Sequence, residues 1–474
     1  MLGLFGTLNM AGQSMETQMT GVSVAGQNLA NVNTAGYTRQ TVDIETSPDI
    51  MTGIGPQGTG AEAVSIQQAV DTLLNGQIQS QQSVNGYWNS QQSALQSVQD
   101  NLDEFLSSSA GSSSSSSSDS TTSSGLSTLL NNVFNDLQSV ATSPTSIGDR
   151  QTLISDAQSL ASAFNQISSG LDQENTDLNT SLGADVDSAN QLLSGVAGLN
   201  QQISAAQFSG GNANDLLDER QQDLNNLAQL ADITTTTGTN GEVNVSIDGQ
   251  TLVSGNQVSQ TLQTYDPGNG NLLVQTSGGT ALTLTGGSME GTIEAREGTL
   301  ATLQSSVNTL ASSLITQVNS IYSGGYSLTG TTGADFFTGS DAASIAVNTS
   351  LVNDPSSFQA SGSATASGDN TVALELANLA DTPQSNLQNE TFSGSFGQTV
   401  GTFGEALQTA NNQASNQTAV TNMLTTQQAS VSGVNLDQEM TNLLSFQQAY
   451  EASAELVTTV NQMLGDTLAM KSGS

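Results

Sequence analysis

Apolar residues recur every three or four positions along most of this chain, which is the spacing that places them on one face of an α-helix. This period predicts helices at about residues 4–31, 66–106, 126–141, 150–208, 215–231, 291–322, 403–431 and 436–470. Gly170 and Gly183 are expected to interrupt the fourth of them. All six prolines lie outside these ranges, as the steric cost of proline inside a helix requires.

The period changes to an alternation of β-forming and polar residues between positions 233 and 284. Val243, Val245 and Ile247 lead into a turn at Asp248-Gly249, and a second turn covers residues 266–270. Two such turns between short alternating runs predict one small antiparallel sheet.

Two further stretches interrupt the helical pattern. Residues 107–124 are nearly all Ser and Thr, a composition that cannot bury a core and that predicts a flexible loop. Residues 323–370 are rich in Gly, Ser and Thr and are expected to be mostly loop.

The predicted fold is mainly α with a β insert, elongated and multi-domain. Residues 1–60 with 405–474 form a terminal coiled-coil domain, 61–230 with 291–404 a long-helix bundle, and 231–290 an antiparallel β module. The N- and C-terminal helices are expected to pair, because each carries an apolar stripe with no nearer partner. The C-terminal stripe is close to a heptad pattern and consists of Leu436, Met440, Leu443, Tyr450, Val457, Leu464 and Leu468.

Charge narrows the possible partners. Five basic residues stand against 42 acidic ones, for a net charge of −37. Nucleic acids and anionic membrane surfaces would repel such a chain, so neither is expected as a partner. No apolar run is long enough to span a bilayer, so membrane insertion is not expected. The acidic surplus is explained by solubility or, alternatively, by an acidic habitat in which carboxylates are protonated.

The chain contains neither Cys nor His, which removes disulfides, thiolate metal sites and the usual general base. A group of carboxylates at positions 215–223 has helical spacing and is interpreted as a solvated helix start. Calcium is a remote option there, since no Asp-x-Asp-x-Asp-Gly loop occurs. No catalytic, metal or cofactor site is predicted. A glycan hydrolase with two carboxylates is a weaker alternative, because aromatic residues are only 4%.

A short polar segment at residues 28–40 ends the first helical stripe abruptly. It contains Asn31, Asn33, Gly36 and Tyr37, and spacing alone favours an ordinary helix stop, in which Gly opens the backbone and Asn bonds its own main chain. It also contains Arg39, one of the few cations in the chain.

The ending Ala35-Gly36-Tyr37-Thr38-Arg39-Gln40 resembles the N-terminal signature of bacterial flagellar axial proteins, and it looks most like the hook-associated protein 1 family. Three other blocks are similar to that family, at residues 214–224, 333–337 and 432–450. The terminal blocks are shared by rod, hook and junction proteins, so the central block is the one that favours the junction family. Residues 338–370 are too few for the outer β-domain that better-known members insert after the Phe-Phe loop.

The resemblance implies a structural, extracellular role at the junction between flagellar hook and filament. It implies export through the type III channel with a chaperone, followed by self-assembly into a short ring or tube beside the hook protein and a second junction protein, hook-associated protein 3. The alternatives are another axial protein of the hook, rod or flagellin type and, more remotely, a surface adhesin. The implied subunit-interface residues are Asn28, Asn31, Asn33, Gly36, Tyr37 and Arg39, with Arg39 as the candidate for an inter-subunit ion pair. The stripe from Leu436 to Leu468 is implied to serve helix packing and chaperone binding.

Overall fold

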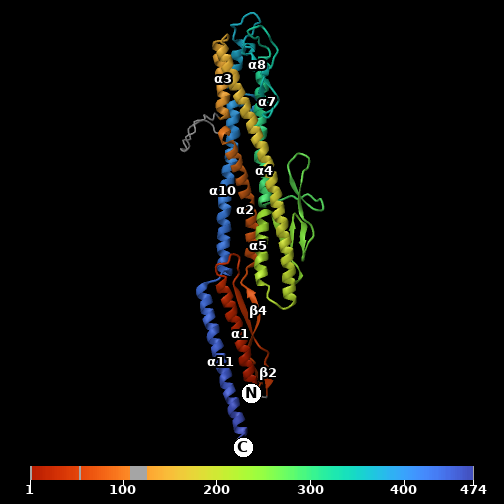
Figure 1. Cartoon of the computed structure of the whole chain (residues 1–474), viewed down its shortest axis with the longest axis vertical. Helices are drawn as coiled ribbons and strands as arrows, with labels where there is room; N and C mark the ends of the chain where they lie inside the picture. Colours follow the sequence, from red (N-terminus) through yellow and green to blue (C-terminus); the bar gives the residue numbers. More distant parts are fainter. Residues whose placement is uncertain (1–2, 53–54, 107–124, 473–474) are drawn as a thin grey trace.

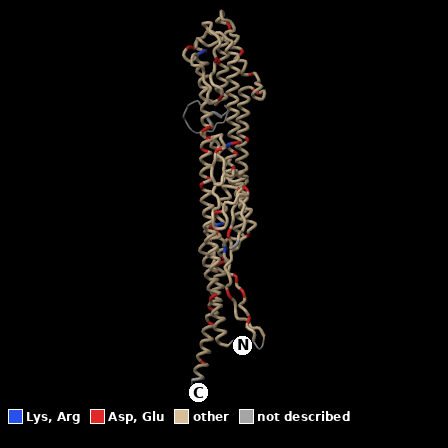
Figure 2. Tube along the Cα trace, turned by 90° about the vertical axis from the view of Figure 1, so that its right-hand side faces the viewer, with Lys and Arg blue, Asp and Glu red and all other residues tan. Residues whose placement is uncertain are grey.

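The computed structural model describes residues 3–52, 55–106 and 125–472. The chain is a long rod, with both termini at one end and most helices running along its length (Figure 1). The predicted Ser-rich loop at 107–124 lies outside the described residues. Acidic residues are spread along the whole rod, while basic residues occur at a few places (Figure 2).

The described part of the chain is mainly helical, as predicted. Its long helices are α1 (Leu4–Ala30), α2 (Thr72–Leu106), α3 (Leu126–Thr142), α4 (Ile147–Phe208), α5 (Asn214–Leu230), α7 (Ala301–Tyr322), α10 (Phe392–Ser432) and α11 (Leu436–Ser472). Shorter helices are α6 (Gly287–Glu294), α8 (Thr349–Asn353) and α9 (Thr371–Asn378), and a π-helical turn (Ala295–Leu300) joins α6 to α7. Helices α2, α3, α4, α7, α9 and α10 share the largest apolar core.

Three helix predictions were wrong in detail. The helix expected from residue 66 begins at Thr72, because Ile66 pairs with Val42 in a β-ladder and Asp71 caps the helix by accepting from the backbone N–H groups of Leu73 and Leu74. Helix α4 runs through both glycines without a break. One glycine costs a helix about 1 kcal/mol, and the buried residues on either side outweigh that cost.

Helix α10 starts eleven residues before the predicted position 403, at Phe392. The Thr391 hydroxyl caps it by accepting from the Gly394 N–H, and Phe392 and Phe396 are both buried one turn apart. The frequent glycines of this turn hid the helical pattern in the sequence. Helix α9 precedes α10 in the stretch between residues 370 and 403, for which no helix was predicted.

The β elements form several small antiparallel sheets. Strand β1 (Gln40–Thr46) pairs with β4 (Ala61–Gln68), and β2 (Ile50–Thr52) pairs with β3 (Gly55–Gln57) beyond them. The β module contains two sheets, where one was predicted. The first has the order β5 (Ile233–Thr237), β6 (Val243–Ile247), β7 (Gln250–Ser254), β8 (Gln257–Val258), and the second pairs β9 (Leu262–Tyr265) with β10 (Leu273–Thr276). A two-residue strand pair, β11 (Phe337–Thr338) with β12 (Ala346–Val347), lies in the stretch expected to be loop.

The turn between β6 and β7 falls where the sequence placed it. Asp248 and Gly249 both have positive φ, 48° and 71°, the combination that a two-residue hairpin loop requires. The module packs along α4, so it extends from one side of the rod (Figure 1).

Three of the four arginines are buried, and their guanidinium groups form hydrogen bonds that link neighbouring segments of the chain. Arg150 donates to the Pro144 carbonyl (2.9 and 2.6 Å), and Arg296 of the π-helical turn donates to Asn179 Oδ1 on α4 (2.6 Å). Arg220 of α5 donates to Asn200 Oδ1 (2.9 Å) and to the Gly241 carbonyl (2.6 Å). Three of the few basic side chains therefore act as internal hydrogen-bond donors. These hydrogen bonds offset the free-energy cost of burying the guanidinium groups.

Helices α1 and α11 pair side by side at the terminal end of the rod, as predicted (Figure 1). The α11 positions that are covered alternate in steps of four and three, the spacing of a coiled-coil seam: Glu439, Leu443, Phe446, Tyr450, Ser453, Val457, Val460 and Leu464. Leu436, Met440 and Leu468 were expected in the same stripe but remain 49%, 44% and 67% exposed. The prediction that these three pack on the N-terminal helix is therefore wrong, because the seam follows Glu439, Phe446 and Ser453 instead.

Gly21 of α1 faces the Phe446 ring of α11, and we expect Gly21→Ala to weaken this helix pair. An added Cβ would lie 2.7 Å from the Phe446 ring, so the ring or the helix must move. Overpacking of this kind costs about 1–3 kcal/mol. Gly12→Ala on the same helix is the matched control, since nothing lies within 4 Å of its added Cβ. Thermal unfolding followed by circular dichroism should show a lower Tm for Gly21→Ala alone; equal Tm values would contradict this packing.

Within the described ranges, no helix is long and apolar enough to cross a membrane.

Candidate assembly interface

Asn28, in the last turn of α1, is fully buried and organises the bend that follows it. Its Nδ2 donates to the Gln40 carbonyl (2.8 Å) and to Glu439 Oε2 on α11 (3.1 Å). Its Oδ1 accepts from the Tyr37 hydroxyl and from the Gln40 backbone N–H, both at 2.9 Å. One amide thus joins the end of α1, the start of β1 and the first turn of α11.

The stop of α1 follows the predicted mechanism. Asn31 Nδ2 donates to the Gln27 carbonyl (3.0 Å), which also accepts from the Asn31 backbone N–H (3.1 Å), so Asn31 closes the last turn of the helix through both its side chain and its backbone. Gly36 has φ +80°, a conformation that favours glycine, and it turns the chain back toward the body. Asn33 lies at the tip of the bend and is exposed.

Tyr37 and Arg39 lie on the inner side of this bend. Burial, followed by the negative charges of Asp215, Asp218 and Glu439, raises the pKa of Tyr37 to about 12, so its hydroxyl keeps the proton that it donates to Asn28. The Arg39 guanidinium lies 3.7 Å from Glu439 and donates to Gln438 Oε1 (3.2 Å). The carboxylate nearest Arg39 belongs to the same chain, and an inter-subunit ion pair of Arg39 stays a prediction.

The carboxylates at the start of α5 hold the bend from the other side. Asp218 accepts from the Thr38 backbone N–H (2.9 Å) and from Gln68 Nε2 (2.8 Å), and Asp215 accepts from Gln40 Nε2 (2.9 Å). Burial raises the pKa of Asp218, while these hydrogen bonds oppose the shift. The interpretation of this cluster as a solvated helix start is wrong for Asp218, which is half-buried against the N-terminal segment, whereas Asp215 is exposed in the first turn of α5, as predicted, although it also binds Gln40.

Gln40, Gln68 and Glu439 were not predicted as site residues. Gln40 and Gln68 form the last pair of the β1–β4 ladder, and both reach α5. Glu439 is 3% exposed. It accepts a hydrogen bond from Asn28 and forms an ion pair with Arg39. The i, i+3 spacing of Asp215 and Asp218 placed them on one helix face, but nothing in the sequence located the partner segment.

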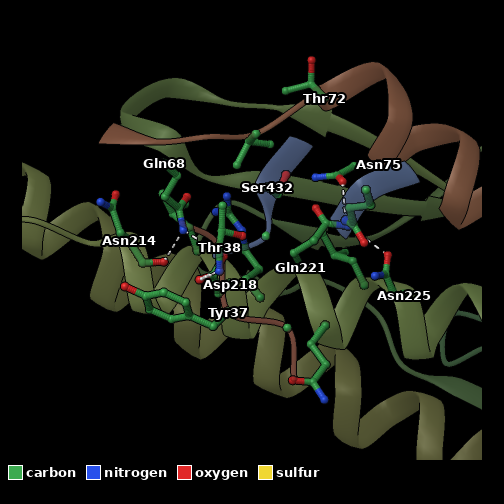
Figure 3. A pocket seen from close by; sticks show the side chains of 18 of the residues that line it. Tyr37, Thr38, Gln68, Thr72, Asn75, Asn214, Asp218, Gln221, Asn225 and Ser432 are labelled. Atoms are coloured by element: carbon green, nitrogen blue, oxygen red, sulfur yellow. Dashed lines mark hydrogen bonds between the residues drawn. The ribbon is translucent and has the colours of Figure 1, made fainter. Parts of the chain in front are cut away.

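A cavity of about 910 Å³ lies beside this junction, between the bend, α5, the β5 strand and the ends of α2 and α10. Its walls consist mostly of amide and hydroxyl side chains, many of them already bonded to each other (Figure 3). Gln428 donates to Asn75 (2.8 Å) and Gln221 to Asn225 (2.9 Å), while Tyr37, Thr38, Gln68 and Asp218 form the other wall. Among the residues described, no group of three or more Asp, Glu, His or Cys side chains could hold a metal ion.

The subunit-interface residues named from the sequence therefore fall into two sets. Asn28, Tyr37 and Arg39 converge on Glu439 and the start of α5, whereas the other three do not: Asn31 is half-buried and bonded to Gln27, and Asn33 and Gly36 are exposed on the outer surface of the bend. On α11, Leu443, Tyr450, Val457 and Leu464 are half-buried on the seam, and Leu436, Met440 and Leu468 face outward. Whether the outward residues meet another subunit or a chaperone stays a prediction.

Comparison with known proteins finds two family models that match parts of the chain and relatives that match nearly all of it. Residues 115–337 match the family model described as the helical domain of flagellar hook-associated protein FlgK. Residues 426–470 match the C-terminal model of the flagellar basal body rod FlgEFG proteins.

Relatives that the chain matches over nearly their whole length are also flagellar hook-associated proteins. The chain is 28% identical over 511 residues to flagellar hook-associated protein 1 of Bacillus subtilis, covering 98% of each chain. It is 23% identical over 550 residues to the Escherichia coli protein of that name, covering 96% of this chain and 97% of the relative. The solved flagellar hook junction protein FlgK from Burkholderia pseudomallei shares the fold, with a TM-score of 0.64, 18% identity and coverage of 75% of this chain and 100% of that one.

Together with these matches, the paired terminal helices, the hydrogen-bonded bend and the helical body indicate a structural protein of the flagellar axial class. Within that class, the helical-domain model, the full-length relatives and the solved structure all support a protein of the hook-associated protein 1 (FlgK) family.

Proposed function

We propose that this chain forms the junction between hook and filament in a bacterial flagellum. The observation that carries this proposal is the end-to-end likeness to hook-associated protein 1, at 28% identity over 98% of both chains. A likeness confined to the terminal helices would suit a rod or hook protein equally well. The match over residues 115–337 is what favours the junction protein over those alternatives.

Exposed apolar side chains at the terminal end of the rod support self-assembly there. Phe5 and Met19 on α1, and Leu444 and Met463 on α11, are each more than half exposed. Met51, on the hairpin beside them, is 79% exposed. Exposed large apolar side chains cost free energy in water, and where they adjoin one another they typically mark a protein–protein contact. We infer that terminal segments of neighbouring copies cover it in a ring or tube.

The remaining parts of the proposal concern the route by which the chain leaves the cell and the proteins that adjoin it in the flagellum. We infer that the chain passes the type III export channel with a chaperone on α11 and assembles outside the cell. Its neighbours would be the hook protein on one side and hook-associated protein 3 on the other. The outward-facing Leu436, Met440 and Leu468 suit chaperone binding, since α1 leaves them uncovered. This role needs no catalytic group, cofactor or metal ion.

Complementation tests the proposal. Cells that lack their hook-associated protein 1 gene should keep hooks and lose filaments, and this chain should restore filaments and swimming. Electron microscopy of purified hook–basal bodies should then find the chain at the hook tip. Normal filaments without any copy of the protein would contradict a junction role. Unchanged filaments with lost surface binding would instead favour the adhesin alternative.

A further inference from the structure

The loop that joins β9 to β10 contains Asn269 followed by Gly270, a pair of residues that can react with each other. The side-chain amide of an Asn can be attacked by the backbone nitrogen of the next residue, and Gly hinders this attack least because it has no Cβ. Asn-Gly occurs in this chain at residues 75–76, 85–86, 240–241 and 269–270. These sites share a sequence but differ in what holds their reacting atoms.

Both reacting atoms of the 269–270 site lie in one closed turn. Asn269 Oδ1 accepts from the Asn271 backbone N–H (3.2 Å). The ring that this hydrogen bond closes includes Asn269 Cγ and the Gly270 nitrogen, so the two atoms stay beside each other. The Asn271 N–H also stabilises the negative charge that Oδ1 acquires when Cγ is attacked.

Asp266 holds the loop in this conformation while leaving it open to water. Its Oδ1 accepts from three successive backbone N–H groups, those of Gly268, Asn269 and Gly270 (2.7, 3.1 and 3.0 Å). All the residues from 266 to 270 are exposed, so water and hydroxide reach the Asn269 amide and the Gly270 nitrogen. A hydrogen bond to an exposed carboxylate in a surface loop opens at low free-energy cost, which frees the Gly270 nitrogen to react.

The backbone of the other Asn-Gly pairs is held more firmly. The pairs at 75–76 and 85–86 lie in α2, where the hydrogen-bond ladder of the helix fixes the backbone nitrogens. Asn85 is in addition only 7% exposed, and its amide is hydrogen-bonded to two neighbouring side chains. In the pair at 240–241, the Gly241 carbonyl accepts from buried Arg220 (2.6 Å). An exposed Asn amide in a loop therefore distinguishes 269–270 from the two pairs in α2.

We propose that Asn269 is a site of spontaneous deamidation in the folded chain, with Gly270 as the attacking residue. The Gly270 nitrogen loses its proton to hydroxide from the solvent and forms a bond to Asn269 Cγ. The bond from Cγ to the side-chain nitrogen breaks, and ammonia leaves after taking a proton from water, which returns the hydroxide. Water then opens the succinimide ring at either of its two carbonyl groups, which gives aspartate or isoaspartate.

This modification changes a contact between the β module and the rod. The Gly270 carbonyl accepts from Asn179 Nδ2 of α4 (3.0 Å), and the Leu272 N–H donates to Asn179 Oδ1 (2.9 Å). Asn179 Oδ1 also accepts from buried Arg296 (2.6 Å). Isoaspartate adds a carbon to the main chain at position 269, and either product places a negative charge close to Asp266. We therefore expect the β9–β10 hairpin to loosen from α4 as the chain ages.

Peptide mapping by mass spectrometry tests the site. Folded wild-type chain is incubated at mildly alkaline pH, and the loss of the amide is followed at Asn269 and at Asn85, the control in α2. Asn269 should convert about tenfold faster, because the helix holds the nitrogen that would attack Asn85. In chain unfolded with urea, the two sites should convert at similar rates, since both are followed by Gly. Similar rates at the two sites in the folded chain would overturn the proposal.

Asn269→Gln is the matched variant for the mechanism. It keeps an exposed side-chain amide at the same position, but attack by the Gly270 nitrogen would have to close a larger ring. Loss of this amide should therefore be about tenfold slower than in the wild type. Equal loss from Asn269 and from the Gln side chain would indicate direct hydrolysis by water and would contradict attack by Gly270.

Hydrogen exchange measures the effect on the hairpin. The Leu272 N–H should exchange about tenfold faster in aged wild-type chain than in fresh chain, because its acceptor Asn179 is no longer held in place. Asn269→Asp adds the charge without lengthening the main chain and should exchange as fresh wild type does. Equal exchange in fresh and aged wild-type chain, once the amide at 269 is lost, would contradict the loosening of the hairpin.

Discussion

Asn28→Asp is expected to release the bend at residues 28–40 and to destabilise the terminal end of the rod by about 3 kcal/mol. The substitution keeps the shape of the side chain but removes both N–H donors. The Gln40 carbonyl then loses its donor (2.8 Å), and a new carboxylate faces Glu439 at the position of a former hydrogen bond (3.1 Å). A buried carbonyl without a donor and two like charges in one buried site both act against the folded junction.

Hydrogen exchange measures this release locally. The backbone N–H of Gln40, which now donates to Asn28 Oδ1, and that of Arg39, which donates to the Ser432 carbonyl, should exchange much faster in the variant. Amides in the core of α4 should be unaffected. Limited proteolysis should cut first within the freed bend.

Asn33→Asp provides the matched control, because it introduces the same change five residues away on an exposed side chain. It should leave exchange at Gln40 and Arg39 as in the wild type. If the two variants behave alike, the buried amide is not what holds the bend, and the β1–β4 hairpin must do so by itself.

The sequence predicted the helices well because their apolar residues are buried in regular stripes. The long runs of α4 and α11 carry this pattern over ten or more turns, and α4 continues through Gly170 and Gly183, which were expected to interrupt it. The pattern failed where tertiary contacts decide the conformation. Residues 66–68 have no strong preference and extend because they pair with residues 40–42, and α10 begins at buried Phe392 in a glycine-rich stretch.

The candidate site was predictable only in part. The residue types of 28–40 indicated a helix stop, and the structure confirms the stop at Ala30 and the positive φ of Gly36. The partners of the bend come from β4, α5 and α11, up to 411 residues away along the chain. No local pattern could connect Asn28 or Arg39 with Glu439.

The second prediction concerns the stability of the whole molecule. We expect the chain to unfold at a higher temperature at pH 5 than at pH 8, because several partly buried carboxyl groups have a raised pKa. Burial, and then the nearby Asp156, raise the pKa of Asp136 on α3 to about 6. Burial and the charges of Glu294 and Glu297 raise the pKa of Glu290 on α6 to about 7. Burial also raises the pKa of Asp185.

The sign follows from proton linkage. A carboxyl with a raised pKa in the folded state binds more protons there than in the unfolded chain. Its stabilising effect is therefore complete below pH about 4 and is lost as pH rises through the folded pKa of about 6 or 7. Asp266 and Asp354 act in the opposite direction, because hydrogen bonds lower their pKa, but their effect is lost only below pH about 4. Maximum stability should thus lie between about pH 4 and 6, with Tm on the order of 5 °C higher at pH 5 than at pH 8.

Calorimetry of dilute wild-type chain and two variants checks this dependence. Asp136→Asn and Glu290→Gln should each raise Tm at pH 8 and leave it nearly unchanged at pH 5, because an amide replaces a carboxyl that is already protonated there. Asp381→Asn removes an exposed carboxylate and alters net charge equally, so it separates these two sites from general charge repulsion. If all three variants change Tm alike, repulsion spread over the 42 acidic residues sets the pH dependence, and the buried carboxyls do not. The self-association of concentrated samples should also increase toward the pI of about 4.1, where repulsion between copies vanishes, so dilution is needed to keep stability and assembly apart.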